Sequence, residues 1–596
     1  MRTVSGLSTA RGFAVGPVFL YCGGGDFPIP EYALVPGAEV DEVMRLRRAK
    51  LEARQDLEEM IATLRERTGR ADIRIFECHM MLLEDPVLIG EAEKHVLEGR
   101  INAEAAVRRT AARARTMFER MTDPYFRERV RDLDDVERRL IKKLLGVAAN
   151  PAFGLSRPSV IVADDLTPSE TVQLPRDLVL GFATNGGSAT SHVALLARSM
   201  GIPAVTGLGD ITSLVSPGDT VLLDGTAGTV TVSPNAAAIR EFRDLVERQK
   251  EISEEALTGA PAGTLHDGGE VLLYANLHPG APFDGVKDSG ARGVGLYRSE
   301  YLWLNDEREP SEEKQFEAYR SVAEFASTLS KGGQVTIRVL DIGGDKLVRG
   351  ISMSSDGRRR REANPFLGNR SIRYLLSNRE VFKTQLRAVL RASAFGKVRL
   401  LYPMISCLDE LRASESILDE VRKALDAEGI AYDHDMEVGA MIEVPSAAIN
   451  AAALAKHVDF FSIGTNDLVQ YTMAADRGND SVSHLYQPTN PAVIWLMRHA
   501  VAVAKERGIK VAVCGESASD PIVGVLWAAM GIDELSMSAT YIPVMSKLFS
   551  KLTRADLDDY LKTVEAAVED ATADEILSVC RNWMEHKIPD IANIVI

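Results

Sequence analysis

Few cysteines, no long apolar run and no excess of basic charge mark this 596-residue chain. The five cysteines lie too far apart for a zinc ribbon or a CxxC redox pair, and reduced thiols in a cytoplasm fit this usage best. No stretch reaches the ~18 uninterrupted apolar residues of a membrane span, so we expect a soluble, cytoplasmic protein. With 85 acidic and 69 basic residues, the net charge of −16 excludes non-specific attraction to nucleic acid or an anionic membrane. A local cluster of basic side chains must therefore hold any anionic ligand.

Three regions differ in their hydrophobic pattern. Between residues 38 and 146, apolar side chains recur at three- and four-residue spacing, which predicts a helical bundle. Short β-type runs lie on both sides of this region, at 12–21, 160–163, 179–182 and 220–223. We therefore expect the bundle to be inserted into an α/β domain formed by residues 1–37 and 147–234. A helical linker at 235–264 follows.

The remaining region, residues 265–596, alternates β runs with helical segments. The β runs are expected at 271–277, 293–297, 334–340, 397–404, 437–443, 460–464, 510–514 and 534–538. Eight successive βα units predict a (β/α)8 barrel, and the fold class is therefore multidomain α/β. In such a barrel the active site lies where the strands end.

Polar residues stand at most of these strand ends. They are Asn276, Arg298, Arg338, Asp341, Glu443, Asn466, Asp467 and Cys514. Each alone is typical of a salt bridge or a turn, but a barrel brings all of them to one face. Glu443 and Asp467 have no histidine or thiolate beside them and suit Mg²⁺, which takes one or two carboxylates plus water and substrate oxygens. The arginines at positions 298, 338, 370 and 477 suit bidentate binding of a phosphate and a carboxylate.

A glycine-containing segment, residues 185–198, precedes another candidate. Gly186 and Gly187 allow close approach of the backbone to a ligand, and a helix is expected to begin near His192. Amides at a helix start favour a neutral imidazole as nucleophile and stabilise a phosphoryl group on its ring nitrogen. A lone histidine in a helix is usually structural, and the adjoining glycines are what favour a functional role here.

A set of motifs carries a resemblance to a known family. They are FECHMMLLED at 76–85, NGGSATSHVALLAR at 185–198, GLYRSE at 295–300, DIGGDK at 341–346, NPFLG at 364–368, MIEVP at 441–445, DFFSIGTNDL at 459–468 and CGE at 514–516. In this order the chain resembles enzyme I of the phosphoenolpyruvate-dependent sugar phosphotransferase system over essentially its whole length.

The resemblance implies a reaction and the residues that perform it. His192, on a phosphohistidine swivel domain, takes the phosphoryl group from phosphoenolpyruvate and passes it to a histidine of the carrier protein HPr. Glu443 and Asp467 bind Mg²⁺, and Cys514 protonates the enolpyruvate carbon. Phosphoenolpyruvate is held by Arg298, Arg338, Asn466 and Arg477, with Arg370 on the phosphoryl group. The bundle at 38–146 docks HPr, and the barrel mediates homodimerisation.

Some residues depart from the family's usual pattern, and other interpretations of the sequence remain open. Ser188 and Ala189 stand where the family usually has a glycine and an arginine, and the run Arg358–Arg361 is either a solvated loop or a gate over an anionic site. Pyruvate phosphate dikinase and phosphoenolpyruvate synthase share the swivelling histidine unit and the barrel, but they need an ATP-grasp module. A regulatory protein that binds phosphoenolpyruvate without turnover is a second alternative. The helix containing Phe76, Met80 and Leu83 faces either a core or a partner.

Overall fold

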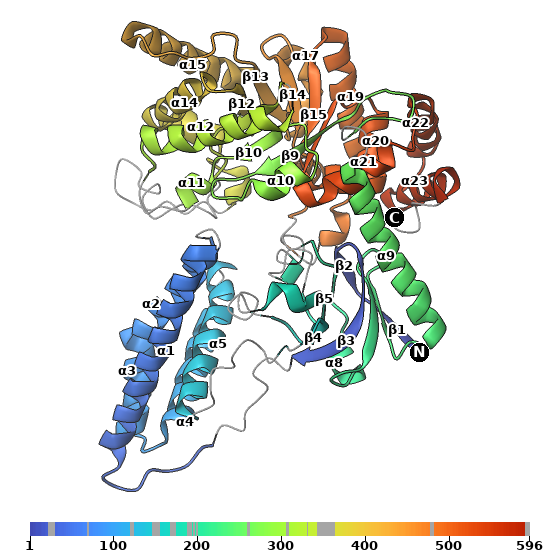
Figure 1. The fold of residues 1–596 in the computed structure, drawn as a ribbon. Coiled ribbons are helices and arrows are strands. Elements are labelled where there is room, and N and C mark those ends of the chain that lie inside the picture. The colour runs from blue at the N-terminus through green and yellow to red at the C-terminus, as the bar shows by residue number, and fades with distance from the viewer. Residues whose placement is uncertain are drawn as a thin grey trace. The chain divides into compact units, whose positions relative to one another are not determined.

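The computed structural model divides into two compact units, Met1–Val246 and Glu247–Ile596, which are described separately (Figure 1). It describes residues 1–21, 30–67, 71–119, 124–145, 155, 157–166, 174–187, 193–194, 197, 201–258, 263–304, 309–330, 332–342, 364–476, 479 and 482–589. Among the helices in these ranges, none combines the length and the apolar character needed to cross a membrane.

A bundle of five helices belongs to the first unit (Figure 1). The helices are α1 (Glu39–Arg67), α2 (Ala71–Glu84), α3 (Pro86–Leu97), α4 (Ala103–Glu119) and α5 (Pro124–Leu144). Apolar side chains at helical spacing, such as Leu46, Leu57 and Leu140, are buried in one hydrophobic core. Phe76 and Leu83 of α2 are fully buried in this core, whereas Met81 is 54% exposed. The α2 positions 76 and 83 therefore face the core.

An eight-stranded sheet forms the rest of this unit. Its strands are β1 (Arg2–Ser5), β2 (Leu7–Ala10), β3 (Phe13–Tyr21), β4 (Ser159–Ala163), β5 (Val179–Thr184), β6 (Ala204–Thr206), β7 (Thr220–Asp224) and β8 (Thr229–Val232), in the order β1-β8-β7-β3-β4-β5-β6-β2. Strands β3 to β6 are parallel, and β1, β2, β7 and β8 pair with their neighbours in antiparallel fashion. All five bundle helices lie in sequence between the adjacent strands β3 and β4, so the predicted insertion is confirmed.

Alternate side chains of the central strand β4 enter two different hydrophobic cores. Val160 and Val162 belong to one core, and Ile161 belongs to the other together with Phe182. The sheet is therefore covered on both faces, which explains why its parallel strands are continuous apolar runs. The short helix α8 (Ile211–Leu214) buries Ile211 in the first of these cores. Helix α9 (Ala236–Thr258) then spans the boundary between the two units.

A closed barrel of eight parallel strands dominates the second unit. The strands are β9 (Leu272–Leu277), β10 (Val294–Arg298), β11 (Gln334–Arg338), β12 (Lys397–Tyr402), β13 (Val438–Ile442), β14 (Phe460–Ile463), β15 (Lys510–Val513) and β16 (Glu534–Met537). Strand β16 pairs with β9 and completes the closure. The predicted (β/α)8 fold is confirmed, and all parallel strands end on one side of the barrel.

Helices separate and surround these strands (Figure 1). They are α10 (Asp284–Asp288), α11 (Tyr301–Leu304), α12 (Glu312–Leu329), α13 (Ile372–Ser377), α14 (Arg379–Ser393), α15 (Leu408–Glu428), α16 (Pro445–Ile449), α17 (Ala451–Leu454), α18 (Thr465–Met473), α19 (Pro491–Arg507), α20 (Pro521–Ala529), α21 (Ile542–Phe549), α22 (Arg554–Val568) and α23 (Ala573–Lys587). Local signals set their limits: Ser311 caps α12, and Gly429 ends α15 at a φ of 68°.

A buried ion pair joins two strands toward the amino-terminal end of the barrel, away from the carboxyl-terminal strand ends. Arg399 of β12 donates to Glu534 of β16 through two hydrogen bonds of 3.0 and 2.6 Å, and both residues are only 1% exposed. Arg399 Nε also donates to Thr336 Oγ1 at 3.0 Å. These contacts satisfy both charges inside the barrel, where an unpaired charge would be strongly destabilising.

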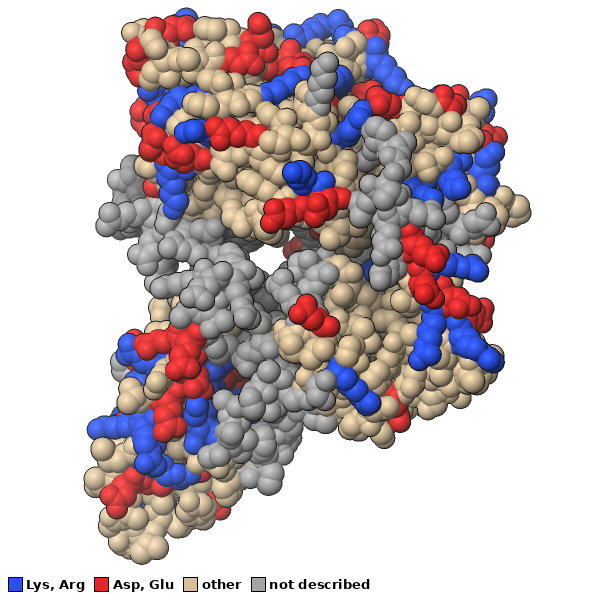
Figure 2. All heavy atoms as spheres, in the orientation of Figure 1, with Lys and Arg blue, Asp and Glu red and all other residues tan. Residues whose placement is uncertain are grey.

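Basic and acidic side chains alternate over the helical bundle and over the barrel helices on the face shown in Figure 2. Many form ion pairs, such as Arg47–Glu93 in the bundle and Arg391–Glu313 on the barrel. On this face acidic and basic side chains are mixed and form no broad field of one sign. Selective binding of an anion must therefore come from a local site.

Candidate active site at the barrel strand ends

Two neighbouring strands place two arginines side by side. Arg298 and Arg338 are register partners at the ends of β10 and β11. Arg338 is buried, with Nη2 2.7 Å from Glu300 Oε1 and Nη1 3.0 Å from Asp341 Oδ2. Burial by itself would lower the pKa of Arg338, but Glu300 and Asp341 outweigh this effect and raise its pKa above the ordinary value. Arg338 is therefore a permanent cation at the strand ends.

Arg370 extends this cluster from the segment that precedes α13. Its Nη2 donates to Asp341 Oδ1 at 3.1 Å, and its Nη1 lies 3.8 Å from Asp467 Oδ1. Asp341 thus lies between two guanidinium groups. Burial would raise the pKa of Asp341, but Arg338 and Arg370 outweigh burial and lower it below its usual range. The result is a continuous buried chain of alternating charges from Glu300 to Asp467.

The carboxylates of Glu443 and Asp467 form the acidic end of this chain. Burial, followed by the charges of Asp467 and Asp341, raises the pKa of Glu443 to about 8. Glu443 Oε1 accepts a hydrogen bond of 2.6 Å from the backbone amide of Met404, whose φ is 54°. Among the described residues, Asp467 Oδ1 has no hydrogen-bond donor. A cation between these two side chains would relieve their repulsion.

No group of three or more histidine, cysteine, aspartate or glutamate side chains in the described part of the chain could hold a metal ion by itself. Glu443 and Asp467 supply two carboxylates at the strand ends. Two carboxylates fit Mg²⁺, which keeps waters and substrate oxygens in its shell. The oxygen-only donors, the unsatisfied Asp467 Oδ1 and the raised pKa of Glu443 all match a hard divalent cation.

Cys514 lies directly after β15 inside the barrel. Its side chain is 3% exposed and packs with Leu296 and Met441. Ser462 Oγ donates to Cys514 Sγ at 3.3 Å. Burial raises the pKa of the Cys514 thiol, which Ser462 and the charge of Arg338 lower to a smaller extent. Cys514 is therefore a protonated thiol at neutral pH and has a proton to donate.

Asn466 lies in the first turn of α18 next to Asp467. Its Oδ1 accepts a hydrogen bond of 2.9 Å from the amide of Glu516, and its backbone carbonyl accepts one of 3.0 Å from Tyr486. The segment after β15 is therefore bonded to the segment after β14. A Cβ on Gly515 would lie 1.9 Å from Thr465 Oγ1, so this approach requires glycine.

The structure brings together most of the residues expected at the site. The buried cluster contains Arg338, Arg370, Glu443 and Asp467, and its charges reach Cys514. Arg298 and Asn466 adjoin it through the β10–β11 ladder and the first turn of α18. Three of the expected features lie outside the described residues: His192, Arg477 and the run Arg358–Arg361.

The surroundings of position 192 are described in part. Val193 and Ala197 are buried in the core on one face of the sheet, as their helical spacing predicts. Before them, Asn185 Nδ2 donates to Asp164 Oδ1 and, at 2.6 Å, to Thr212 Oγ1. Asn185 is therefore anchored to the residue that follows β4 and to helix α8.

Several residues of the site were not singled out by sequence reasoning. Glu300 pairs with Arg338, Tyr471 accepts from Arg370, and Ser462 donates to Cys514. Tyr471 had a detectable signal, because it follows Asp467 by four residues on one helix and therefore shares its face. Ser462 points inward from β14, but a serine in a buried strand carries no comparable signal.

Comparison with known proteins identifies the family. Three family models match: "PEP-utilising enzyme, N-terminal" at residues 5–129, "PEP-utilising enzyme, mobile domain" at 155–228 and "PEP-utilising enzyme, PEP-binding domain" at 253–554. The phosphoenolpyruvate-protein phosphotransferase of Geobacillus stearothermophilus is 40% identical over 97% of this chain and 97% of its own. The chain belongs to the phosphoenolpyruvate-protein phosphotransferase family. The resemblance seen in the motifs is thereby confirmed.

Further members of the phosphoenolpyruvate-protein phosphotransferase family show the same level of sequence identity. The proteins of Bacillus subtilis and Haemophilus influenzae are each 40% identical, over 88% of this chain and 90% of their own. The chain is accordingly an enzyme, a phosphotransferase. The PEP-binding model covers all eight barrel strands and the buried arginine and carboxylate cluster. The mobile-domain model covers position 192.

Proposed function

We propose that this phosphotransferase moves the phosphoryl group of phosphoenolpyruvate onto a ring nitrogen of His192, releases pyruvate, and then passes the phosphoryl group to a histidine of HPr. The observation that carries the proposal is the buried chain Glu300–Arg338–Asp341–Arg370–Asp467 at the strand ends. In the first step the bond from phosphorus to the enol oxygen breaks and a bond from phosphorus to His192 nitrogen forms. The enolate left behind takes a proton at carbon and becomes pyruvate.

Arg298, Arg338, Asn466 and Arg477 hold phosphoenolpyruvate in this proposal, with Arg370 on the phosphoryl group. Among the described residues, the buried Nε atoms of Arg338 and Arg370 have no hydrogen-bond acceptor. Free donors on two buried guanidinium groups support an anionic ligand, because an unsatisfied charged donor is unfavourable. Phosphoryl transfer asks the protein chiefly for placement and charge neutralisation, which fixed arginines supply.

Glu443 and Asp467 would hold Mg²⁺ in the same proposal. When bound, the ion supplies positive charge that neutralises the phosphoryl oxygens and the two carboxylates. The chain's own contribution is orientation. The Met404 amide fixes one oxygen of Glu443, and Arg370 lies beside Asp467, so the two carboxylates stay in place.

Cys514 donates the proton to the enolate carbon. Its thiol is buried, its pKa is raised, and its neighbours at the strand ends include the charge of Arg338. Ser462 Oγ–H points at Sγ and stabilises the thiolate that remains after the proton leaves. Ketonisation of the enolate draws the phosphoryl transfer forward.

Each domain has its own role in the proposal. Residues 1–37 and 147–234 carry His192 and must alternate between the barrel (265–596) and the carrier, with 235–264 as the linker. The bundle at 38–146 docks HPr in this proposal. A homodimer through the barrel and a cytoplasmic location also belong to this proposal.

One labelling experiment tests the proposed function. The full chain is incubated with Mg²⁺ and phosphoenolpyruvate carrying a radioactive phosphoryl group, with and without HPr, and with labelled ATP as the rival donor. We expect one acid-labile label that moves to HPr and that ATP does not supply. His192→Ala should abolish it, whereas His434→Ala, at an exposed histidine whose ring lies 4.3 Å from that of Tyr432 at a tilt of 42°, should not. An unchanged label in His192→Ala would exclude this acceptor.

A further inference from the structure

Tyr471 contacts the phosphoryl-side arginine from the same helix that carries Asp467. Its hydroxyl accepts a hydrogen bond of 3.2 Å from Arg370 Nη1 and donates one of 2.6 Å to the backbone carbonyl of Phe366. We propose that Tyr471 is a positioning residue, which fixes the Arg370 guanidinium relative to Asp467 for phosphoryl transfer. This inference rests on the proposed function and on the role it gives to Arg370.

The need for such a residue follows from the other partners of Arg370. Asp341 and Asp467 are both carboxylates, and the Phe366 ring centroid lies 5.9 Å from the guanidinium carbon. Carboxylates draw the guanidinium toward themselves, and a third one would repel an incoming phosphoryl group. A neutral phenol orients Nη1 without adding negative charge to the anion site.

The protonation state of Tyr471 suits this role. Burial is the largest effect on this phenol and, with the nearby carboxylates, raises its pKa to about 12 despite the opposing charge of Arg370. The hydroxyl therefore keeps its proton at neutral pH. That proton goes to the Phe366 carbonyl, and a lone pair remains for Arg370 Nη1.

The Tyr471 hydroxyl thus bonds both to the side chain of Arg370 and to the backbone carbonyl of Phe366, four residues earlier. Phe366 lies in the 3₁₀ turn Pro365–Leu367, and the Arg370 amide donates to the Gly368 carbonyl at 3.1 Å. Ser371, which follows, has a φ of 57°, a left-handed conformation that needs support from its surroundings. The Tyr471 contacts therefore hold the whole turn that presents Arg370.

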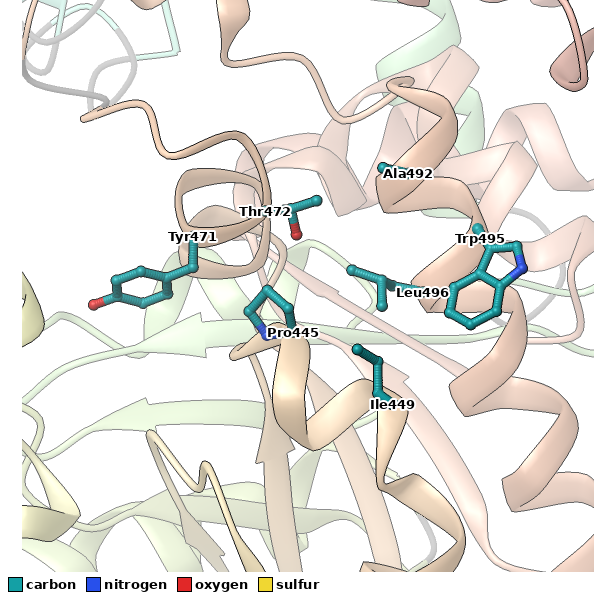
Figure 3. A pocket seen from close by; sticks show the side chains of 7 residues that line it. All are labelled: Pro445, Ile449, Tyr471, Thr472, Ala492, Trp495 and Leu496. Carbon is teal, nitrogen blue, oxygen red and sulfur yellow. The ribbon is translucent and has the colours of Figure 1, made fainter.

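The ring and the hydroxyl of Tyr471 have separate surroundings, which makes the inference testable. An open apolar groove of about 420 Å³ is lined by part of Tyr471 together with Thr472, Leu496 and Trp495. The phenol of Tyr471 points away from Leu496 and Trp495 (Figure 3). Replacing Tyr471 by phenylalanine keeps the ring and removes only the hydroxyl. Any loss of activity then reports on the contacts to Arg370 and Phe366.

The test measures single-turnover labelling of His192 by phosphoenolpyruvate and Mg²⁺ in the full chain. Tyr471→Phe should lower the rate constant about tenfold, the effect of losing one hydrogen bond to a charged group. The half-saturating phosphoenolpyruvate concentration should change less than about threefold, because the other arginines still bind the substrate. Thr472→Val is the matched control, since its hydroxyl donates within α18 to Leu468 O at 2.6 Å. It should label at the wild-type rate.

A double-variant cycle separates positioning from a general structural effect. In an Arg370→Lys background, Tyr471→Phe should lower the labelling rate constant by less than about twofold, because the guanidinium that Tyr471 positions is already gone. An undiminished tenfold loss in that background, or a wild-type rate in Tyr471→Phe alone, would overturn the inference. Absence of any label in the wild-type chain would instead refute the proposed function.

Discussion

Alanine at position 464 should raise the Mg²⁺ concentration that phosphoryl transfer needs while the barrel stays folded. Gly464 follows β14, and a Cβ built on it would lie 2.7 Å from Glu443 Oε2 and 3.0 Å from Glu443 Cβ. The φ of Gly464 is −87°, which other residues adopt, so the substitution adds a contact without forcing a left-handed backbone. The new methyl group therefore acts chiefly on the Glu443 carboxylate.

The structure sets the size of the effect. A separation of 2.7 Å is about 0.7 Å short of ordinary van der Waals contact at 3.4 Å. Oε1 is held by the Met404 amide, so the carboxylate relieves the clash by turning Oε2 out of its position. A metal-binding group displaced in this way should raise the Mg²⁺ concentration needed for half-maximal labelling of His192 by roughly 10–100-fold. Overpacking should lower the free energy of unfolding by only about 1–3 kcal/mol.

Two measurements on the full chain check this reasoning. One is His192 labelling as a function of Mg²⁺ concentration, and the other is the Mg²⁺-induced rise in thermal unfolding temperature, which needs no turnover. Gly285→Ala in α10 is the control, because no atom lies within 4 Å of a Cβ at that position. It should behave like wild type in both. If Gly464→Ala keeps the wild-type Mg²⁺ requirement, Glu443 Oε2 does not face the metal.

Two further predictions concern the barrel interior. Cys514→Ala should slow pyruvate formation far more than it weakens phosphoenolpyruvate binding, because the enolate loses its proton donor. A coupled pyruvate assay measures the first effect and equilibrium binding measures the second. Unaltered turnover would exclude the Cys514 thiol as the proton donor. Arg399→Met should lower the free energy of unfolding by about 3–5 kcal/mol, because Glu534 stays buried without its partner. In chemical denaturation, Arg399→Met/Glu534→Leu should recover part of this loss, and an equally unstable double variant would contradict the explanation.

Much of the barrel is predictable from sequence for a simple physical reason. Parallel strands buried on both faces appear as continuous apolar runs, so the run at 510–514 corresponds to β15 (Lys510–Val513) and the run at 437–443 to β13 (Val438–Ile442). Short edge strands give a weaker signal. β1 (Arg2–Ser5) is largely exposed and polar, so its place in the sheet follows only from its pairing with β8.

Some features of the candidate site are likewise predictable from sequence, and others are not. Charged residues at strand ends, such as Glu443 and Arg338, are predictable because the barrel topology brings strand ends together. Their pairing is not, because Asp341 bridges Arg338 to Arg370, which lies 29 positions further along the chain, and no local pattern encodes such a contact. The left-handed backbone of Met404 is equally hidden, since it depends on the tertiary bond to Glu443. The roles of all the candidate site residues, His192 and Arg477 among them, stay predictions.

The connection between β3 and β4 has an evolutionary consequence. These adjacent parallel strands need a crossover, and here a complete five-helix core takes the place that a single helix fills in an ordinary βαβ unit. The register of the sheet depends on the strands and not on the size of the excursion between them. Selection can therefore exchange or remodel the helical bundle as a unit, while the sheet keeps its strand order.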